Sequence, residues 1–216
     1  ELLRSIVLSL AYLHETPGEI AFVLIDPKNR AFADLDELPH LARPVVVEGT
    51  EAAEALGSLV RLMERRDANR ESAPPVVVVI DELVDLMMVD AQRNNGQPPV
   101  ESCVTRLVQR GREAGIHVVA ATQKPTAAVI GSLVKANFPV RIVGKVSSAN
   151  DARVAAGWSG TGAERLLGKG DFVAVAEGKV HRFQGALITP AEVGGLIEYH
   201  IKKHWELRDL QTGRSN

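Results

Sequence analysis

The chain has 216 residues, 45% of them hydrophobic, and a formal net charge of −2 at pH 7, which suits one large α/β domain or two small ones. Its only cysteine, Cys103, excludes an internal disulfide and a cysteine-rich metal site and is compatible with a reducing compartment. No apolar stretch approaches the roughly 20 residues that a membrane span needs, so we expect neither a membrane span nor a signal peptide in this sequence.

The predicted elements alternate between helices and short apolar strands. In chain order they are a helix over residues 1–13, strands over 20–25 and 44–47, a helix that Thr50 caps, the strand 76–80, a helix over 100–114, the strand 116–121, a helix over 126–136, the strand 140–146, a short helix that Ser148 caps, a hairpin formed by 172–176 and 180–187, and a helix from Pro190. Apolar strands separated by helices predict a single α/β domain over residues 1–216. We expect a mostly parallel sheet with helices on both faces and the terminal hairpin as an antiparallel addition.

Positive charge is concentrated in one part of the sequence. Residues 101–145 hold seven lysines and arginines against two glutamates, although the whole chain is slightly negative. This asymmetry favours a face that meets a polyanion, while ordinary scattered surface charge remains the alternative.

Polar residues follow three of the predicted strands. They are Asp26-Pro27-Lys28, Asp81-Glu82 and Thr122-Gln123-Lys124. Ligands bind beyond the carboxyl ends of parallel strands, so we read these segments together. In ATP hydrolysis one carboxylate orients Mg²⁺ and a second aligns the attacking water, which suits Asp81 and Glu82 respectively. Gln123 is placed to detect the γ-phosphate. The competing interpretation of Asp81-Glu82 is a helix start decorated with acids, which favours the helix dipole.

Several segments follow one another in the order and spacing of a known ATPase family. They include Ile25-Asp-Pro-Lys28, Leu38-Pro-His-Leu41, Val79-Ile-Asp-Glu-Leu-Val-Asp-Leu-Met-Met88, Gly115-Ile-His-Val-Val-Ala-Ala-Thr-Gln-Lys-Pro125, Leu133-Val-Lys-Ala-Asn-Phe-Pro139 and Gly162-Ala-Glu-Arg-Leu-Leu-Gly-Lys-Gly-Asp171. The ordered set resembles the motor domain of FtsK/SpoIIIE DNA translocases and extends to about residue 190.

The resemblance implies a RecA-like fold, ATP and Mg²⁺ as ligands, and a homo-oligomeric ring, usually hexameric, that moves double-stranded DNA during chromosome segregation or cell division. It makes Asp81 the magnesium carboxylate, Glu82 the catalytic carboxylate and Gln123 the nucleotide sensor. It also implies a cytoplasmic motor, with membrane attachment through other regions of the intact protein left open.

The family also uses an arginine from the neighbouring subunit to neutralise charge in the transition state. Arg141 and Arg153 are both candidates, and we prefer Arg153. Lys124, Lys135 and Lys145 fit a surface that contacts DNA phosphates without reading bases.

One family motif does not occur in the sequence. The phosphate loop G-x-x-x-x-G-K-[ST] is absent from the 216 residues, and relatives carry it just before the first helix. We expect it to be encoded upstream of Glu1, and we expect this segment alone to hydrolyse ATP poorly. The alternatives are a type VII secretion or conjugation coupling ATPase of the same superfamily, or a non-catalytic interaction domain with a degenerate phosphate site.

Overall fold

The computed structural model describes residues 1–91, 99–123 and 137–212. They divide into two compact units. The first comprises Leu3–Ala121 and Ile188–Asn216, and the second comprises Thr122–Leu187. The expectation that residues 1–216 form a single motor domain stays a prediction.

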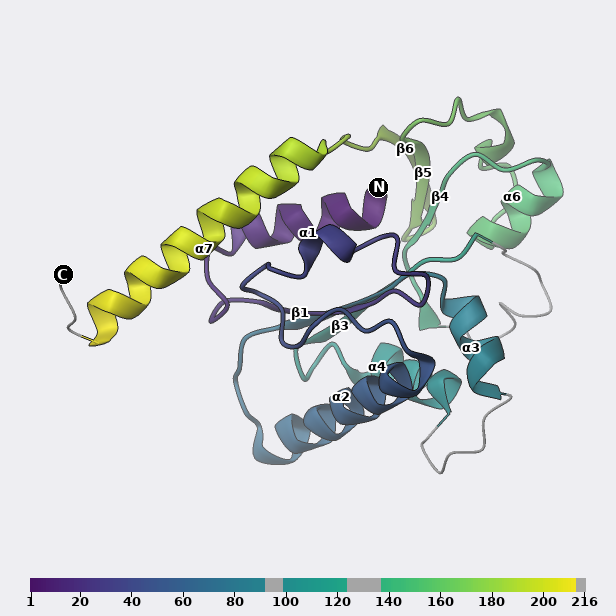
Figure 1. Ribbon diagram of the computed structural model, residues 1–216. Coiled ribbons are helices and arrows are strands. Elements are labelled where there is room, and N and C mark those ends of the chain that lie inside the picture. Colours follow the sequence, from purple (N-terminus) through teal and green to yellow (C-terminus); the bar gives the residue numbers. More distant parts are fainter. Residues whose placement is uncertain (92–98, 124–136, 213–216) are drawn as a thin grey trace. The chain divides into compact units, whose positions relative to one another are not determined.

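The first unit is built around a parallel sheet of three strands in the order β1-β2-β3 (Figure 1). These are β1 (Ala21–Ile25), β2 (Val76–Ile80) and β3 (Ile116–Ala120). The register pairs the last residues of all three strands, so their carboxyl ends lie level at one edge of the sheet. Every residue of β2 is buried, as a central parallel strand covered on both faces requires.

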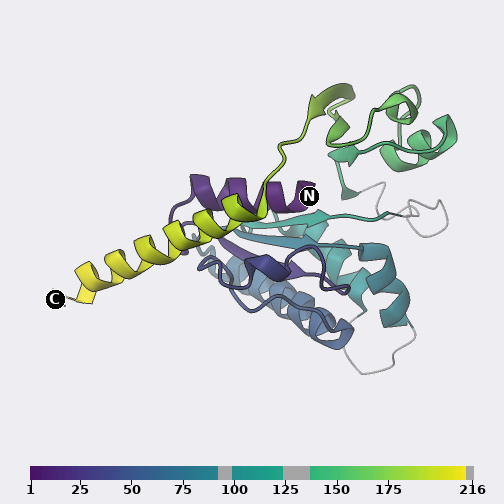
Figure 2. The same ribbon diagram turned by 45° about the horizontal axis from the view of Figure 1, so that its top comes forward.

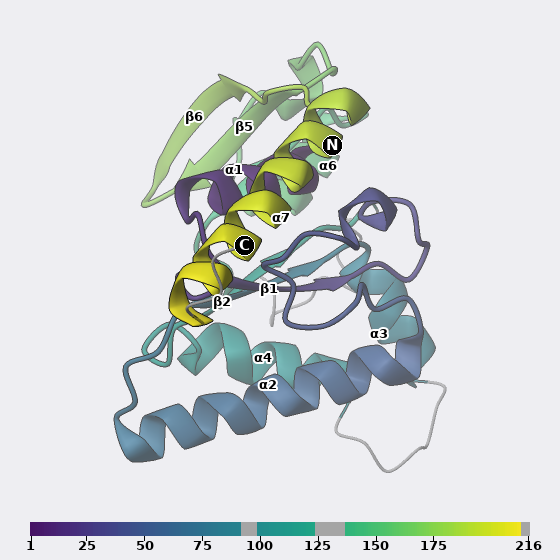
Figure 3. The ribbon, with the colours of Figure 1, turned by 60° about the vertical axis from the view of Figure 1, so that its left-hand side comes forward.

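Two pairs of helices cover the two faces of this sheet. Figures 2 and 3 show α1 (Leu2–Leu13) and α7 (Pro190–Thr212) on one face, with α2 (Gly49–Asn69) and α4 (Val100–Arg110) side by side on the other. Alternate valines of β2 pack into the cluster formed with α1 and α7, because successive strand side chains point to opposite faces. This arrangement confirms the predicted mostly parallel sheet with helices on both faces.

Some predicted boundaries in the first unit were wrong. Residues 44–47 form no strand; Val46 makes only an isolated parallel bridge with Ile25. Thr50 does not cap α2, because the helix begins one residue earlier and Glu48 occupies the cap position. The helix expected to reach residue 114 ends at Arg110. The helix predicted over 126–136 lies outside the described residues.

The second unit contains an antiparallel sheet in the order β4-β5-β6. Its strands are β4 (Arg141–Val143), β5 (Asp171–Ala176) and β6 (Lys179–Gln184). The β5–β6 hairpin was predicted, but it pairs with β4 in a sheet of its own and not with the parallel strands. Its tight turn uses the left-handed backbone of Glu177 and Gly178, with φ of 51° and 71°, which matches the twist of a hairpin.

The helix α6 (Ala149–Ala156) packs against this second sheet. Ser148 caps it as predicted, because the Ser148 hydroxyl accepts a hydrogen bond of 3.1 Å from the backbone N–H of Asp151. Two buried alanines of α6 join valines of β4 and β5 in a small core. Across both units, none of the helices in the described ranges is long and apolar enough to cross a membrane.

Candidate functional site

The parallel register brings two aspartates to the same edge of the sheet. Asp26 follows β1 and Asp81 follows β2, and the backbone N–H of Asp81 donates to the carbonyl of Ile25 over 2.9 Å. The sequence prediction that these strand ends would lie together is correct for the β1 and β2 ends.

Asp26 organises the turn that follows β1. Its side chain is fully buried, and one carboxylate oxygen accepts backbone N–H groups of Arg30, Ala31 and Phe32 over 2.7, 2.6 and 3.2 Å. The other oxygen accepts the N–H of Lys28 over 3.2 Å. Four backbone donors satisfy this buried carboxylate, so its primary role is to fix the loop that carries Lys28.

Asp81 has a different environment at the end of β2. Burial raises the pKa of its carboxyl group, and the nearby charges of Asp26 and Glu82 raise it further. Within the described ranges, no side-chain hydrogen bond or ion pair reaches the Asp81 carboxylate. The strand end therefore concentrates negative charge that a cation would relieve.

Glu82 forms the junction between β2 and α3 (Leu83–Ala91). It is 1% exposed, and its backbone is left-handed, with φ of 56°. A residue other than glycine in this region costs roughly 1–3 kcal/mol, and such strain is concentrated at functional sites. Backbone hydrogen bonds fix both sides of the junction: the N–H of Leu83 donates to Ala121 over 2.9 Å, and the Glu82 carbonyl accepts from Leu86 over 3.1 Å.

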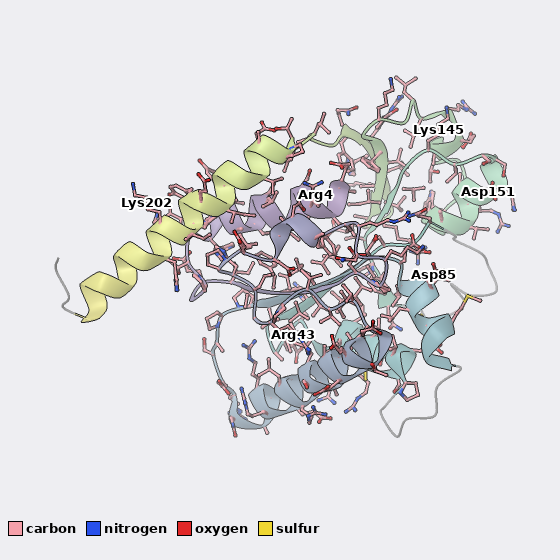
Figure 4. All side chains as sticks on the ribbon, in the orientation of Figure 1. Arg4, Arg43, Asp85, Lys145, Asp151 and Lys202 are labelled. Carbon is pink, nitrogen blue, oxygen red and sulfur yellow. The ribbon has the colours of Figure 1, made fainter. Side chains whose placement is uncertain are left out.

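Lys28 connects the β1 end to this junction. Its Nζ lies 3.8 Å from Oε2 of Glu82 and 2.8 Å from Oδ2 of Asp85. The hydrogen bond to Asp85 is the main reason that the pKa of Lys28 is raised. Figure 4 labels Asp85 on α3. Sequence reasoning used Lys28 and Asp85 only as parts of motifs and gave neither a role; a basic residue two positions beyond a strand-end aspartate was the available signal.

The donor set at this edge fits magnesium. Mg²⁺ prefers carboxylate oxygens and is usually held by one or two protein carboxylates, with phosphate oxygens and waters completing the octahedron. Among the described residues, no three or more histidine, cysteine, aspartate or glutamate side chains are grouped so that they could hold a metal ion. Asp81 supplies the kind of single carboxylate that a magnesium–nucleotide site requires.

Comparison with known proteins decides the family. The sequence profile of the FtsK/SpoIIIE family matches residues 1–69 and 66–127. The chain belongs to the FtsK/SpoIIIE family.

Several curated relatives of this family member are named as DNA translocases. The protein named DNA translocase FtsK of Sporosarcina ureae is 36% identical over 228 residues, which cover 93% of this chain and 28% of that protein. DNA translocase FtsK of Listeria monocytogenes is 36% identical over 225 residues, covering 91% of this chain and 29% of that protein. The chain therefore spans less than a third of the length of these relatives.

Solved structures support the fold of this FtsK/SpoIIIE family member. The cytoplasmic domain of the type VII secretion ATPase EccC from Thermomonospora curvata matches with a TM-score of 0.73 and 22% identity, covering 93% of this chain and 26% of that one. The pCW3 conjugation coupling protein TcpA, solved with ATPγS, matches with a TM-score of 0.69 and 23% identity, covering 89% and 61%. The chain therefore has the RecA-like α/β fold that the sequence predicted.

The remaining candidate residues of the family site belong to the second unit. Gln123 is exposed and follows the end of β3. Lys145 is also exposed and is labelled in Figure 4, whereas Lys124 and Lys135 lie outside the described residues. Their roles stay predictions.

The two arginines proposed for action on a neighbouring subunit differ in their surroundings. Arg141 is partly buried, and its Nη1 donates to the carbonyl of Ala156 over 2.9 Å. A Cβ atom at Gly157 would lie 1.6 Å from the same nitrogen, so the guanidinium fills the space that the glycine leaves. Arg153 is exposed on α6 and donates to Oδ1 of Asn150 over 3.0 Å.

Proposed function

We propose that the chain is the motor core of a cytoplasmic ATPase that moves along double-stranded DNA as a homo-oligomeric ring, most simply a hexamer. The observation that carries the proposal is the acidic edge of the parallel sheet, where Asp81 is partly buried beside the charges of Asp26 and Glu82, and Glu82 has a strained backbone. The likeness to DNA translocases over more than nine-tenths of the chain supports the choice of substrate.

The acidic edge supplies two functions in this proposal. Asp81 would hold the magnesium ion, and Glu82 accepts the proton of the attacking water and aligns that water with the γ-phosphate. When bound, Mg²⁺ neutralises phosphate oxygens as charge moves towards the leaving group. Glu82 is nearly inaccessible to bulk solvent, which limits the number of orientations that its carboxylate can adopt.

Two further roles in this proposal are assigned from the family resemblance to residues of the second unit. Gln123 detects the γ-phosphate, and Arg153 enters the site of the neighbouring subunit. We assign this role to Arg153 because it is exposed, whereas Arg141 is engaged with the carbonyl of Ala156 at the end of α6. An arginine that acts on another subunit must be accessible to it, and Arg153 is the more exposed of the two.

DNA is bound through its phosphates in this proposal. Lys124, Lys135 and Lys145 neutralise the backbone without reading bases, which suits a motor that moves along any sequence. Together they account for three of the seven basic residues in the positive stretch 101–145.

The test is ATP hydrolysis by the complete protein as its gene encodes it, with and without duplex DNA. We expect hydrolysis that duplex DNA stimulates and that rising salt suppresses, because phosphate contacts release counterions. Hydrolysis that DNA leaves unchanged would favour a motor for protein substrates. Failure to bind ATP at all would favour the non-catalytic interaction domain and overturn the proposal.

A further inference from the structure

A buried carboxylate that aligns a water molecule needs a partner that stabilises its negative charge and orients its oxygen atoms. The Glu82 side chain is 2% exposed, and its ion pair with Lys28 is long at 3.8 Å. An ionised carboxylate removed from water is costly unless a cation compensates it. Lys28 is a cation that the described structure brings to this carboxylate.

Lys28 is held more tightly by a second acid than by Glu82. The contact with Asp85 is 2.8 Å, and the Asp85 side chain is 30% exposed whereas that of Lys28 is 41% exposed. The shorter contact holds the ammonium group beside α3. At this position the ammonium group also attracts the Glu82 carboxylate over the longer distance. The three charges therefore form a chain from the partly exposed Asp85 to the buried Glu82.

The backbone on both sides of this charge chain is fixed independently. Asp26 accepts four backbone N–H groups and so fixes the loop that carries Lys28. The left-handed Glu82 is held between β3 and the first turn of α3. With both backbones fixed, the ammonium group of Lys28 lies where its charge can bias the orientation of the Glu82 carboxylate.

We propose that Lys28 is a positioning residue that orients the Glu82 carboxylate for water attack, with Asp85 as the anchor of Lys28. The inference rests on the proposed function, because it assigns Glu82 the role of aligning water. Lys28 acts through Glu82 and makes no essential contact with ATP.

The experiment measures kcat and the dissociation constant of ATP for Lys28→Met in the complete protein with duplex DNA. We expect kcat to fall about 10- to 100-fold, because misplacing a general base loses much of its contribution. The dissociation constant of ATP should stay within about twofold. Lys28→Arg, which keeps the charge, should recover most of the loss. Lys202→Met, on the exposed lysine of α7 labelled in Figure 4, is the matched control and should leave both values unchanged.

A double substitution separates positioning from a general structural effect. In the Glu82→Gln background, Lys28→Met should lower kcat no further, because the group through which it acts is already lost. Asp85→Asn provides a second route to the same test, since it removes the anchor and not the lysine. It should lower kcat by less than Lys28→Met does while leaving ATP binding intact.

Three results would overturn the inference: a normal kcat in Lys28→Met, a large loss of ATP affinity in that variant, or losses that multiply in the Glu82→Gln background. ATP hydrolysis by the unaltered protein shows whether the Lys28 inference alone fails or the proposed function fails as well. If the unaltered protein hydrolyses ATP and Lys28→Met does so equally well, only the role of Lys28 is refuted. If the unaltered protein hydrolyses no ATP with or without DNA, both are refuted, whereas hydrolysis that DNA leaves unchanged refutes only the choice of substrate.

Discussion

Two aspartates at strand ends, one in each unit, have opposite electrostatic surroundings. Asp171 opens β5, where its carboxylate accepts hydrogen bonds from Nε and Nη2 of Arg182 over 2.8 and 2.7 Å, and from the N–H of Leu167 over 2.7 Å. These donors lower the pKa of Asp171 to about 2. Asp81 follows β2, where burial and the charges of Asp26 and Glu82 raise its pKa.

The comparison indicates that the Asp171 carboxylate has a structural role, whereas the Asp81 carboxylate is suited to binding a ligand. Asp171 receives a bidentate arginine and a backbone donor from its own unit, so it stabilises the fold with no further partner. Asp81 is partly buried beside two other carboxylates, and the nearby charge of Lys28 offsets this only in part, so its charged form is disfavoured in the folded chain. A carboxyl group perturbed by burial and like charge at the carboxyl end of a parallel strand is a candidate for ligand binding or catalysis.

The largest expected effect comes from Glu82. Glu82→Gln should lower ATP turnover of the complete protein by about 10²- to 10⁴-fold, the range for loss of a general base, while ATP still binds. Asp171→Asn is the counterpart in the second unit and should leave turnover per folded molecule near normal. Steady-state hydrolysis and equilibrium ATP binding check both variants. Near-normal turnover in Glu82→Gln would remove the acidic edge from the mechanism.

In the second unit, we expect a substitution at Gly157 to lower stability, because the guanidinium of Arg141 occupies the space beside this glycine. Gly157→Ala places a Cβ atom 1.6 Å from Nη1 of Arg141, at a φ of 66°. The Arg141 side chain must move aside, so backbone strain and the displaced hydrogen bond should together cost about 2 kcal/mol. Hydrogen exchange of the amides in α6 and β4 measures the loss.

The matched control is Gly178→Ala in the hairpin turn. Gly178 also has a positive φ, of 71°, but a Cβ atom there would meet nothing within 4 Å. Only the backbone strain remains, at about 1 kcal/mol. Equal losses from the two substitutions would show that the guanidinium of Arg141 contributes nothing to the effect.

The stability of the protein should change with pH in opposite directions through Asp171 and through Asp81. The pKa of Asp171 is lowered from its ordinary 3.8 to about 2, so its contribution to stability is present above about pH 4 and is lost as the pH falls to about 2. Asp171→Asn should therefore destabilise the second unit at pH 7 and have little effect at pH 2. Chemical denaturation at both pH values tests this. A destabilisation that is equal at the two pH values would contradict it.

Asp81 should show the opposite behaviour and the smallest effect. Because its pKa is raised, the folded chain favours the protonated carboxyl group, and this advantage is lost as the pH rises through the folded pKa. Asp81→Asn should therefore stabilise the metal-free protein at pH 7, with the gain vanishing below pH 3.8. Thermal unfolding over this pH range provides the measurement. A loss of stability at pH 7 would mean that the carboxylate is already compensated in the folded chain.

The sequence predicted the elements that local patterns determine. The apolar run Val76–Ile80 followed by two acids identified the central strand, because a parallel strand buried on both faces has no polar position until it ends. The Ser148 cap and the hairpin turn at residues 177–178 were likewise readable from short-range chemistry.

Features that depend on distant residues were not predictable. The left-handed backbone of Glu82 has no sequence signal, because glutamate is not a residue that favours positive φ. The Lys28 bridge depends on the register of β1 against β2 and on the start of α3. The missing strand over 44–47 has a similar cause, since only Val46 meets β1 in register.

The most direct test of the central claim is the binding of Mn²⁺, a paramagnetic substitute for Mg²⁺, to the complete protein in the presence of ATP. Electron paramagnetic resonance measures the bound fraction in the unaltered protein, in Asp81→Asn and in Asp171→Asn. The account predicts that Asp81→Asn weakens Mn²⁺ binding by at least about tenfold, whereas Asp171→Asn binds as the unaltered protein does. Equal binding by the unaltered protein and Asp81→Asn would contradict the assignment of a metal site to the acidic edge of the parallel sheet.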